Sequence, residues 1–327
     1  MKKKIVTNLL AEKKHLKAIL QSKRANIYYL EYCRILQNGG RVEYITQAKD
    51  KQAYWNIPIA NTSVILLGTG TSITQSAVRM LASAGVMIGF CGGDGTPLFA
   101  GTEVDWLSPQ SEYRPTEYVQ SWLSFWFDPV KRIQVAKELQ IIRLSNIINI
   151  WKKEPLFKEY GIYADDEAFE SIISDMQASI ERATSVQNLL EIEGRTTKRI
   201  YAYIVRATGF GSFKRDHESA DGANVFLNHG NYLAYGLAAT ALWTLGIPHS
   251  FAVMHGKTRR GALVFDIADL VKDAIVLPTA FVCVLRGDDE RKFRETLMDL
   301  FIDRYGAIDI MIESIKLVCA QYGEPVK

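Results

Sequence analysis

Cysteine is scarce in this chain of 327 residues, and the four that occur lie far apart: Cys33, Cys91, Cys283 and Cys319. No C-x-x-C pair is present, which excludes a dense disulfide framework and argues against a zinc site built from cysteine. A strong excess of one charge is also missing, because 39 Lys and Arg residues oppose 36 Asp and Glu residues, for a net charge of +3. This balance excludes an overall polycation but is compatible with a local basic groove.

The long apolar core of a signal peptide is absent from the basic segment 1–10, so a cytoplasmic protein is expected. In the apolar stretch 222–256, the only side chains that ionise near neutral pH are His229, His249 and His255. This stretch also contains asparagines, glycines and a proline, which a lipid-facing helix of about 20 residues would rarely carry. It is therefore interpreted as a buried helix over about 230–245.

A folded globular protein is indicated by the composition, with 48% apolar and 23% charged residues. Residues 2–24 combine eight Lys or Arg with leucines at helical spacing, which predicts a short basic amphipathic helix. Alternating Tyr, Ile and Val, with Asn38-Gly39-Gly40 as a hairpin signal, predict strands further on. The predicted strands are 26–30, 41–45, 54–59, 64–67 and 86–91, with a helix over 72–84.

Helical periodicity dominates the rest of the chain. The predicted helices are 115–160, 166–190, 192–209, 230–245, 267–285, 288–304 and 306–321, with a loop at 214–221. The pattern predicts an α+β protein of two domains. A β-rich domain with a basic N-terminal extension (1–105) precedes a linker (106–118) and a larger all-α domain (119–327).

A glycine turn, Gly68-Thr69-Gly70-Thr71-Ser72, follows one predicted strand and precedes a helix. It is half of a dinucleotide fingerprint, in which backbone amides and a helix N-terminus would cradle phosphates. The third glycine is missing, and the alternative is a structural turn in which a hydroxyl side chain caps the helix. The turn alone favours the structural interpretation.

A dense group of ionisable residues lies between His255 and Asp269. Asp266 and Asp269 are three positions apart at a predicted helix start, so both can face one way. With the imidazole of His255 they suit a Mn²⁺ or Mg²⁺ site facing phosphates. Alternatively, Asp266 is a helix cap beside solvated basic residues. The basic residues on this loop are Lys257, Arg259 and Arg260.

A second candidate opens the predicted helix 192–209 with Ile192-Glu193-Gly194-Arg195. Arg195, Arg199 and Arg206 share one helical stripe, from which Glu193 is offset. The stripe is either a solvated helix face or a phosphate-binding surface beside a carboxylate ligand.

Taken in order, these motifs resemble the universal CRISPR adaptation endonuclease-integrase family, over nearly the whole chain. The resemblance rests on the Glu193 helix, on Asn231-Tyr232-x-x-Tyr235-Gly, on the His255-Gly-Lys loop and on Phe-Asp266-Ile-Ala-Asp269-Leu. The segments SKRANIYYL, NGGRVEY, YWNIPIAN, LLGTGTS, GFCGG and WLSPQSEYRPTEY are similar to its type I-F branch.

The resemblance implies an N-terminal β-sandwich and a helical catalytic domain. It also implies that Glu193, His255 and Asp269 are ligands of Mn²⁺ or Mg²⁺, with Asp266 as an additional active-site acid. Such an enzyme cleaves DNA and inserts new spacers into a CRISPR array by transesterification. The implied partners are double-stranded and branched DNA, a second copy of the chain, and a small ferredoxin-like adaptation protein fused to a helicase-nuclease, without a membrane.

Two other functions stay open from the sequence. A nucleotide-binding oxidoreductase would use the turn at Gly68–Gly70 and predicts a parallel sheet near the N-terminus. A DNA-binding scaffold without catalysis predicts salt-dependent binding and no metal-dependent cutting. Phosphate contacts are expected both for the endonuclease-integrase and for the DNA-binding scaffold. On the basis of their charge and their proximity to the candidate site, these contacts are assigned to five residues: Arg195, Arg199, Lys257, Arg259 and Arg260.

Neutralising Lys257, Arg259 or Arg260 singly is expected to weaken DNA binding to a similar degree across sequences, because phosphate contacts carry no base information. Each loss should lower the slope of log affinity against log salt by roughly 0.7–0.9. Binding titrations at several salt concentrations measure the slope. An unchanged slope in all three variants would mean that these side chains are only solvated.

Overall fold

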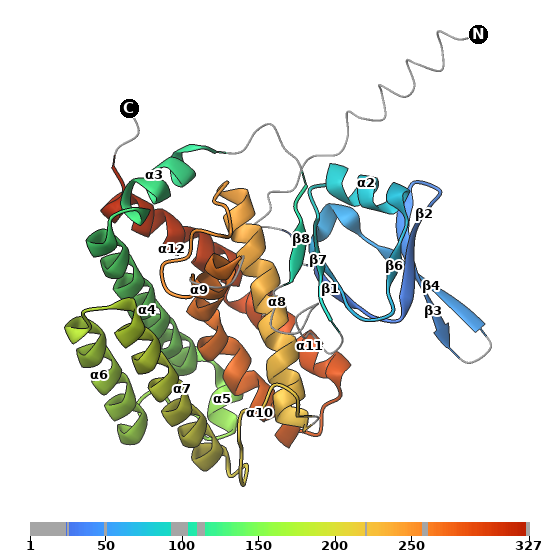
Figure 1. Cartoon of the computed structure of the whole chain (residues 1–327). Coiled ribbons are helices and arrows are strands. Elements are labelled where there is room, and N and C mark those ends of the chain that lie inside the picture. The colour runs from blue at the N-terminus through green and yellow to red at the C-terminus, as the bar shows by residue number, and fades with distance from the viewer. Residues whose placement is uncertain are drawn as a thin grey trace, which may run out of the picture.

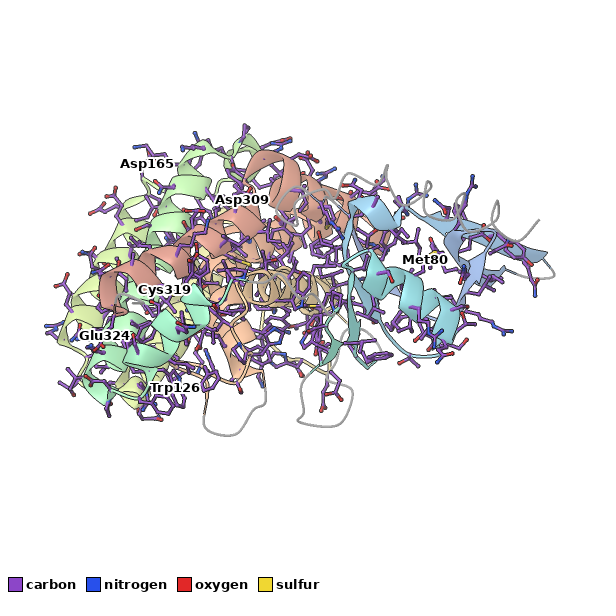
Figure 2. The ribbon with its side chains drawn as sticks, turned by 90° about the horizontal axis from the view of Figure 1, so that it is seen from above. Met80, Trp126, Asp165, Asp309, Cys319 and Glu324 are labelled. Carbon is purple, nitrogen blue, oxygen red and sulfur yellow. The ribbon has the colours of Figure 1, made fainter. Side chains whose placement is uncertain are left out.

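The described chain consists of a strand-rich region and a helical region that meet at one face of a β-sheet (Figure 1). The structure, a computed structural model, describes residues 24, 26–48, 51–92, 104–109, 115–219, 221–256 and 261–324. Seen from above in Figure 2, Met80 marks the strand-rich region and Cys319 the helical region. The helix predicted over 2–24 lies outside the described residues, except for its last position.

Two four-stranded sheets form the strand-rich region, with the orders β1-β5-β7-β8 and β4-β3-β2-β6. The strands are β1 (Asn26–Leu30), β2 (Cys33–Asn38), β3 (Arg41–Ala48), β4 (Lys51–Ile57), β5 (Thr62–Leu67), β6 (Ser72–Ile73), β7 (Met87–Phe90) and β8 (Asp105–Leu107). Strands β1, β5 and β7 are parallel, and β8 is antiparallel to β7. The predicted hairpin is confirmed, since Gly39 and Gly40 at positive φ join β2 to β3.

A small apolar core between the two sheets confirms the β-sandwich. Ile35 and Val42 of the second sheet pack in one cluster with Ile65 and Leu67 of the first. Helix α2 (Gln75–Ser83) adds buried Leu81 to the same cluster. The predicted linker begins inside β8, so the strand-rich region extends to at least residue 107.

Strand β5 is buried on both faces, which explains its apolar run over 64–67. While alternate side chains point into the sandwich, Val64 and Leu66 belong to the large core of the helical region. Helix α8 (Gly222–Thr244) lies against them, and a Cβ at Gly236 would stand 3.1 Å from Val64 Cγ1. The absence of a side chain at Gly236 therefore lets the central helix approach the sheet closely.

Further helices complete the helical region. They are α3 (Glu117–Trp126), α4 (Pro129–Lys153), α5 (Pro155–Glu159), α6 (Glu167–Arg182), α7 (Val186–Thr208), α9 (Ala262–Val271), α10 (Leu277–Leu285), α11 (Glu290–Met298) and α12 (Ala307–Tyr322), with π-helical segments η5 (Lys272–Val276) and η6 (Asp299–Arg304). Helix α8 is apolar around nearly its whole circumference because neighbours surround it, as the buried-helix interpretation predicts. No helix in the described ranges has the length and hydropathy needed to cross a membrane.

The predicted boundary between helices 166–190 and 192–209 is wrong. The chain breaks near Ser185, whose hydroxyl accepts a hydrogen bond from Asn188 N at 3.1 Å, and α7 then continues through Gly194 to Gly209. A glycine inside a helix costs only about 1 kcal/mol, which packing of the apolar face offsets. Glu193 therefore lies in the middle of a helix and not at its start.

The predicted helix start at Asp266 is also wrong. Helix α9 begins at Ala262, after Gly261 in the left-handed conformation (φ 73°). Burial of Ala262, Leu263 and Val264 against the core extends the helix upstream of the position that sequence favoured. Asp266 is thus in the second turn and does not cap the helix.

The turn at Gly68 is structural. Three parallel strands are present, as the oxidoreductase hypothesis predicts, but the turn leads into β6 of the second sheet and not directly into a helix. Helix α2 starts later, capped by Thr74. A Cβ at Gly68 would meet Glu31 Cγ at 2.7 Å, so close side-chain packing accounts for the glycine.

His229 of α8 should make stability depend on pH. It is only 5% exposed, its ring meets Tyr29 edge-on at 4.6 Å, and its Nε2 has no hydrogen-bond partner among the described residues. Burial, assisted by the charge of Arg294, lowers the pKa of His229 to about 4.

Between about pH 6.5 and pH 4, His229 is therefore protonated in the unfolded chain but stays neutral in the folded protein. The free energy of unfolding consequently falls as the pH falls through this range. From pH 7 to pH 5, His229→Gln should lose roughly 1–2 kcal/mol less unfolding free energy than the wild type. Urea unfolding of both proteins at the two pH values tests this. Equal losses would mean that His229 does not titrate in this way.

Candidate metal centre

Glu193, His255 and Asp269 converge from three separate elements. Glu193 comes from α7, His255 from the segment before α9, and Asp269 from α9 itself. One ligand atom from each residue lies within 4.8 Å of the other two. Two carboxylates and one imidazole at this spacing are a ligand set that a divalent cation can bridge.

Arg143 of α4 holds one oxygen of Glu193 and is buried, with 4% of its side chain exposed. Its Nη1 donates to Oε1 of Glu193 at 2.9 Å, while Oε2 lies 3.7 Å from Nε2 of His255. Its Nε donates to Oδ2 of Asp273 at 2.9 Å, and its Nη2 also contacts that oxygen. Burial alone would lower the pKa of Arg143, but Asp273 and Glu193 raise it, so the guanidinium stays charged.

The carboxylates of Glu193 and Asp269 lie close enough to repel each other. Burial and the charge of Asp269 raise the pKa of Glu193, even though Arg143 works in the opposite direction. Burial also opposes ionisation of Asp269, but the cation of Lys272 and that of Arg143 lower the pKa of Asp269 to about 2. A divalent cation between the two carboxylates would relieve this repulsion, so the residues fit such an ion.

Asp266 positions His255 and is not itself one of the converging ligands. Its Oδ1 lies 2.7 Å from Nδ1 of His255, so the other ring nitrogen is left to face Glu193. Its two oxygens also accept backbone N–H groups from Val253, Met254 and His255 at 2.8, 3.1 and 3.2 Å. Burial tends to lower the pKa of His255, but Asp266 and Asp269 raise it to about 9.

Asp269 is held in a similar way at the junction of α9 and η5. Lys272 Nζ donates to Oδ1 of Asp269 at 2.5 Å, and the same ammonium lies 5.3 Å from the ring centre of Tyr235. Each member of the triad is therefore fixed by a charged partner, a common arrangement around protein metal ligands.

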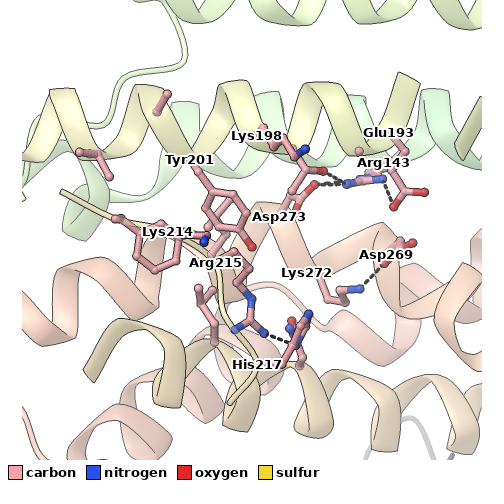
Figure 3. A pocket seen from close by; sticks show the side chains of 18 of the residues that line it. Arg143, Glu193, Lys198, Tyr201, Lys214, Arg215, His217, Asp269, Lys272 and Asp273 are labelled. Atoms are coloured by element: carbon pink, nitrogen blue, oxygen red, sulfur yellow. Dashed lines mark hydrogen bonds and ion pairs between the residues drawn. The ribbon is translucent and has the colours of Figure 1, made fainter. Parts of the chain in front are cut away.

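The triad opens into a pocket of about 1260 Å³ between α7, α8 and the segment 209–217 (Figure 3). Basic side chains line it beyond the triad: Lys198, Arg206, Lys214, Arg215 and Lys272. The predicted loop is confirmed for 214–219, which forms neither helix nor strand. It is anchored nonetheless, because Arg215 donates to Asn224 Oδ1 at 2.8 Å and to Asn228 Oδ1 at 2.6 Å.

Not every predicted site residue reaches this pocket. Arg199 pairs with Asp175 of α6 at 2.9 Å, and Arg195 is exposed elsewhere on α7, so neither side chain lines it. Lys257, Arg259 and Arg260 fall outside the described residues. On the predicted arginine stripe, only Arg206 borders the pocket.

Sequence analysis missed Arg143, Lys272 and Asp273. Arg143 lies on a buried stripe of α4 whose other members are apolar except for Gln140, which is a signal for a buried ion pair. Asp273 continues the spacing of Asp266 and Asp269 by one turn inside an apolar run. Both signals mark buried charge, but neither one identifies its partner.

Comparison with known proteins adds independent evidence. The family model described as CRISPR associated protein Cas1 matches residues 28–310. A CRISPR-associated endonuclease Cas1 from Pseudomonas aeruginosa is 53% identical, covering 92% of this chain and 94% of that protein. Another from Pectobacterium atrosepticum is 51% identical, covering 95% of this chain and 97% of that protein. The family resemblance seen in the sequence is confirmed.

Solved structures share the fold. The crystal structure of a TtCas1–DNA complex matches with a TM-score of 0.63 at 23% identity, covering 92% of this chain and 94% of that one. A Cas6-RT-Cas1–Cas2 complex matches with a TM-score of 0.65 at 15% identity, covering 91% of this chain and 35% of that one. At these identities the likeness supports the architecture alone.

Asp266→Ala should lower both stability and metal affinity, because its carboxylate holds the backbone at 253–255 together with the His255 ring. Buried N–H groups left unpaired cost at least about 2 kcal/mol of unfolding free energy. Loss of a group that orients a ligand lowers Mn²⁺ affinity about 10–100-fold. Thermal melts and Mn²⁺ titration measure the two effects.

Asp289→Ala is the matched control, since Asp289 caps α11 through Lys292 N at 2.8 Å and does not line the pocket. It should lose about 0.5–2 kcal/mol and keep its Mn²⁺ affinity. Wild-type Mn²⁺ affinity in Asp266→Ala would contradict the positioning role.

Proposed function

This chain belongs to the Cas1 family of CRISPR-associated proteins, and from that premise we propose that it is a metal-dependent DNA endonuclease and integrase. Its activity is the insertion of new spacers into a CRISPR array. The observation that carries the proposal is the convergence of Glu193, His255 and Asp269 in a pocket with a basic wall. Relatives at 51–53% identity that bear the name endonuclease support it.

The ion is Mn²⁺ or Mg²⁺, held by Glu193, His255 and Asp269. Oxygen and imidazole ligands without thiolates suit these ions, and the four cysteines of the chain are buried away from the triad. When bound, such an ion neutralises charge on a scissile phosphate and stabilises an attacking or leaving oxygen. Asp266 acts through His255, whose ring it orients.

The basic side chains of the pocket bind the DNA backbone. Lys198 and Lys214 line the side formed by α7 and the segment 209–217 (Figure 3), and Arg206 of α7 also lines the pocket. Side chains of this type contact phosphates without reading bases. Of the sequence-assigned contacts, Arg195 and Arg199 would extend this surface outside the pocket, while Lys257, Arg259 and Arg260 stay predicted phosphate contacts.

The reaction needs no covalent enzyme nucleophile. In hydrolysis the attacking group is water, and in integration it is the 3′-hydroxyl of an incoming DNA fragment. In both, one phosphodiester oxygen leaves as the new bond to phosphorus forms. The part of the chain is to hold the phosphate and the attacking oxygen together, which accounts for a large share of such rate enhancements.

Integration at the two edges of a repeat requires two active sites, so the functional unit includes a homodimer. The partner that bridges the two sites is a Cas2-type protein, which in the type I-F branch is fused to a helicase-nuclease. A solved complex that contains both Cas1 and Cas2 supports this assembly. The catalytic unit is the helical domain 119–327.

The two rival functions lack comparable support. The Gly68 turn is filled by neighbouring side chains, and a nucleotide-binding oxidoreductase is not supported by any of the relatives described above. A non-catalytic scaffold would not need two buried carboxylates and an imidazole within ligand distance of one another, since burying such groups is costly.

Glu193→Ala, His255→Ala and Asp269→Asn should each lower metal-dependent cleavage of branched DNA by roughly 100-fold or more, because the first two remove a ligand of the ion and the third removes the negative charge of one. Circular dichroism should show a folded protein in every case. Gel assays with Mn²⁺, Mg²⁺ or chelator measure cleavage, and chelator should abolish it in the wild type.

Glu313→Ala serves as the control, since it removes an exposed acid of α12 that pairs only with neighbouring Lys316 among the described contacts. Its cleavage should equal that of the wild type. A triad variant that cuts at the wild-type rate would remove that residue from the site. Salt-dependent DNA binding by a wild type that never cuts would favour the scaffold.

A further inference from the structure

Each metal-binding side chain has a second polar atom that is already engaged. Oε1 of Glu193 accepts from Arg143 at 2.9 Å, and Oδ1 of Asp269 accepts from Lys272 at 2.5 Å. The two carboxylates can therefore each turn one remaining oxygen toward an ion. The inference drawn from this pattern rests on the metal site proposed above.

Arg143 is held in place next to Oε1 of Glu193, because all three nitrogens of its guanidinium form hydrogen bonds or ion pairs. Besides Glu193, the guanidinium bonds Asp273 through Nε, Gln140 Oε1 through Nη1 at 3.1 Å, and Thr197 Oγ1 through Nη2 at 3.1 Å. These partners come from α4, α7 and η5. Because residues of three elements hold the planar guanidinium of Arg143, its N–H group points toward Glu193 in a fixed direction.

Gln140 extends the same network toward the histidine ligand. Its Nε2 donates to Sδ of Met254 at 3.3 Å, one residue before His255. The backbone N–H of Met254 is in turn held by Asp266. Arg143 thus contacts Glu193 directly and reaches the segment that carries His255 through Gln140 and Met254.

Single-oxygen ligation distinguishes between divalent ions. Ca²⁺ takes six to eight oxygens at 2.3–2.6 Å and often binds carboxylates through both oxygens. Mg²⁺ demands near-octahedral geometry and keeps several waters, and Mn²⁺ is suited by the same carboxylate and water ligands. A site that offers two single carboxylate oxygens and one imidazole supplies few of the oxygens that Ca²⁺ takes, so water would have to provide most of them.

We propose that Arg143 and Lys272 are positioning residues that restrict Glu193 and Asp269 to one metal-facing oxygen each and thereby make the site discriminate against Ca²⁺. The two residues therefore affect the ratio of the affinity for Mn²⁺ to the affinity for Ca²⁺. General loosening of the site would weaken the binding of Mn²⁺ and Ca²⁺ together. Loss of Arg143 or Lys272 instead frees a second carboxylate oxygen, which lowers the affinity for Mn²⁺ but keeps the affinity for Ca²⁺ nearly constant because Ca²⁺ can use both oxygens.

The test measures metal binding without DNA. The full-length protein is stripped with chelator, Mn²⁺ is titrated by isothermal calorimetry, and Ca²⁺ is then used to displace Mn²⁺ while free Mn²⁺ is followed by electron paramagnetic resonance. The variants are Arg143→Met/Asp273→Leu, which replaces a buried ion pair by apolar groups, and Lys272→Met. Replacing both partners avoids leaving a buried charge unpaired.

Each variant should bind Mn²⁺ about tenfold more weakly, as expected when a group that orients a ligand is lost. Ca²⁺ affinity should change less than about twofold, so the Mn²⁺-to-Ca²⁺ ratio falls by roughly tenfold. Arg143→Lys, which keeps one charge, should recover part of the ratio. Arg304→Met is the matched control, since Arg304 bonds buried Glu154 at 2.9 Å and does not line the pocket. It should leave both affinities unchanged.

An unchanged ratio in a folded Arg143 variant, or equal losses for both ions, would overturn the proposal. If the Arg143 double variant fails to fold, the ratio in Lys272→Met decides in the same way. These outcomes differ from failure of the metal site itself, which would appear as wild-type Mn²⁺ binding that is insensitive to Glu193→Gln.

Discussion

Negative charge buried inside an apolar helical core is the constraint on which the site depends. Glu193, Asp269 and Asp273 lie in or beside packed apolar side chains, where a carboxylate is costly to bury unless a cation or hydrogen bonds accompany it. Arg143 and Lys272 offset this cost by lying between the carboxylates. Because a buried ion pair is stable only when its geometry and remaining hydrogen bonds are satisfied, the four elements that supply these residues must pack in one arrangement.

The position of the helices follows from the sheet on which they rest. One face of strand β5 lies in the sandwich core and the other in the helical core, so α8 packs directly on the sheet of the strand-rich region. Helix α8 in turn packs against α9, which supplies Asp269, and against η5, which supplies Asp273. Substitutions far from the triad, at Val64 or Gly236 for example, would therefore reach the site through a short chain of packed elements.

Much of the architecture could be predicted because it depends on local patterns. Alternating apolar residues and the Asn-Gly-Gly turn identify the β2–β3 hairpin, and helical periodicity identifies the all-α region. Helix starts were less predictable. The chain does not break between 190 and 192, and Asp266 does not begin α9, because in both places packing against neighbouring helices outweighs the local preference.

By itself the sequence determined the ligand types, the family, and the order of a strand-rich and a helical region, since these are properties of residue identity and short-range spacing. Only the tertiary structure decided which charges meet. Arg143 lies 50 positions before Glu193 and 130 before Asp273, and no local pattern relates residues so far apart. Likewise, Asp269 faces the pocket while Asp266, one turn earlier, faces the backbone of 253–255, and this difference arises from the neighbours that packing places around α9.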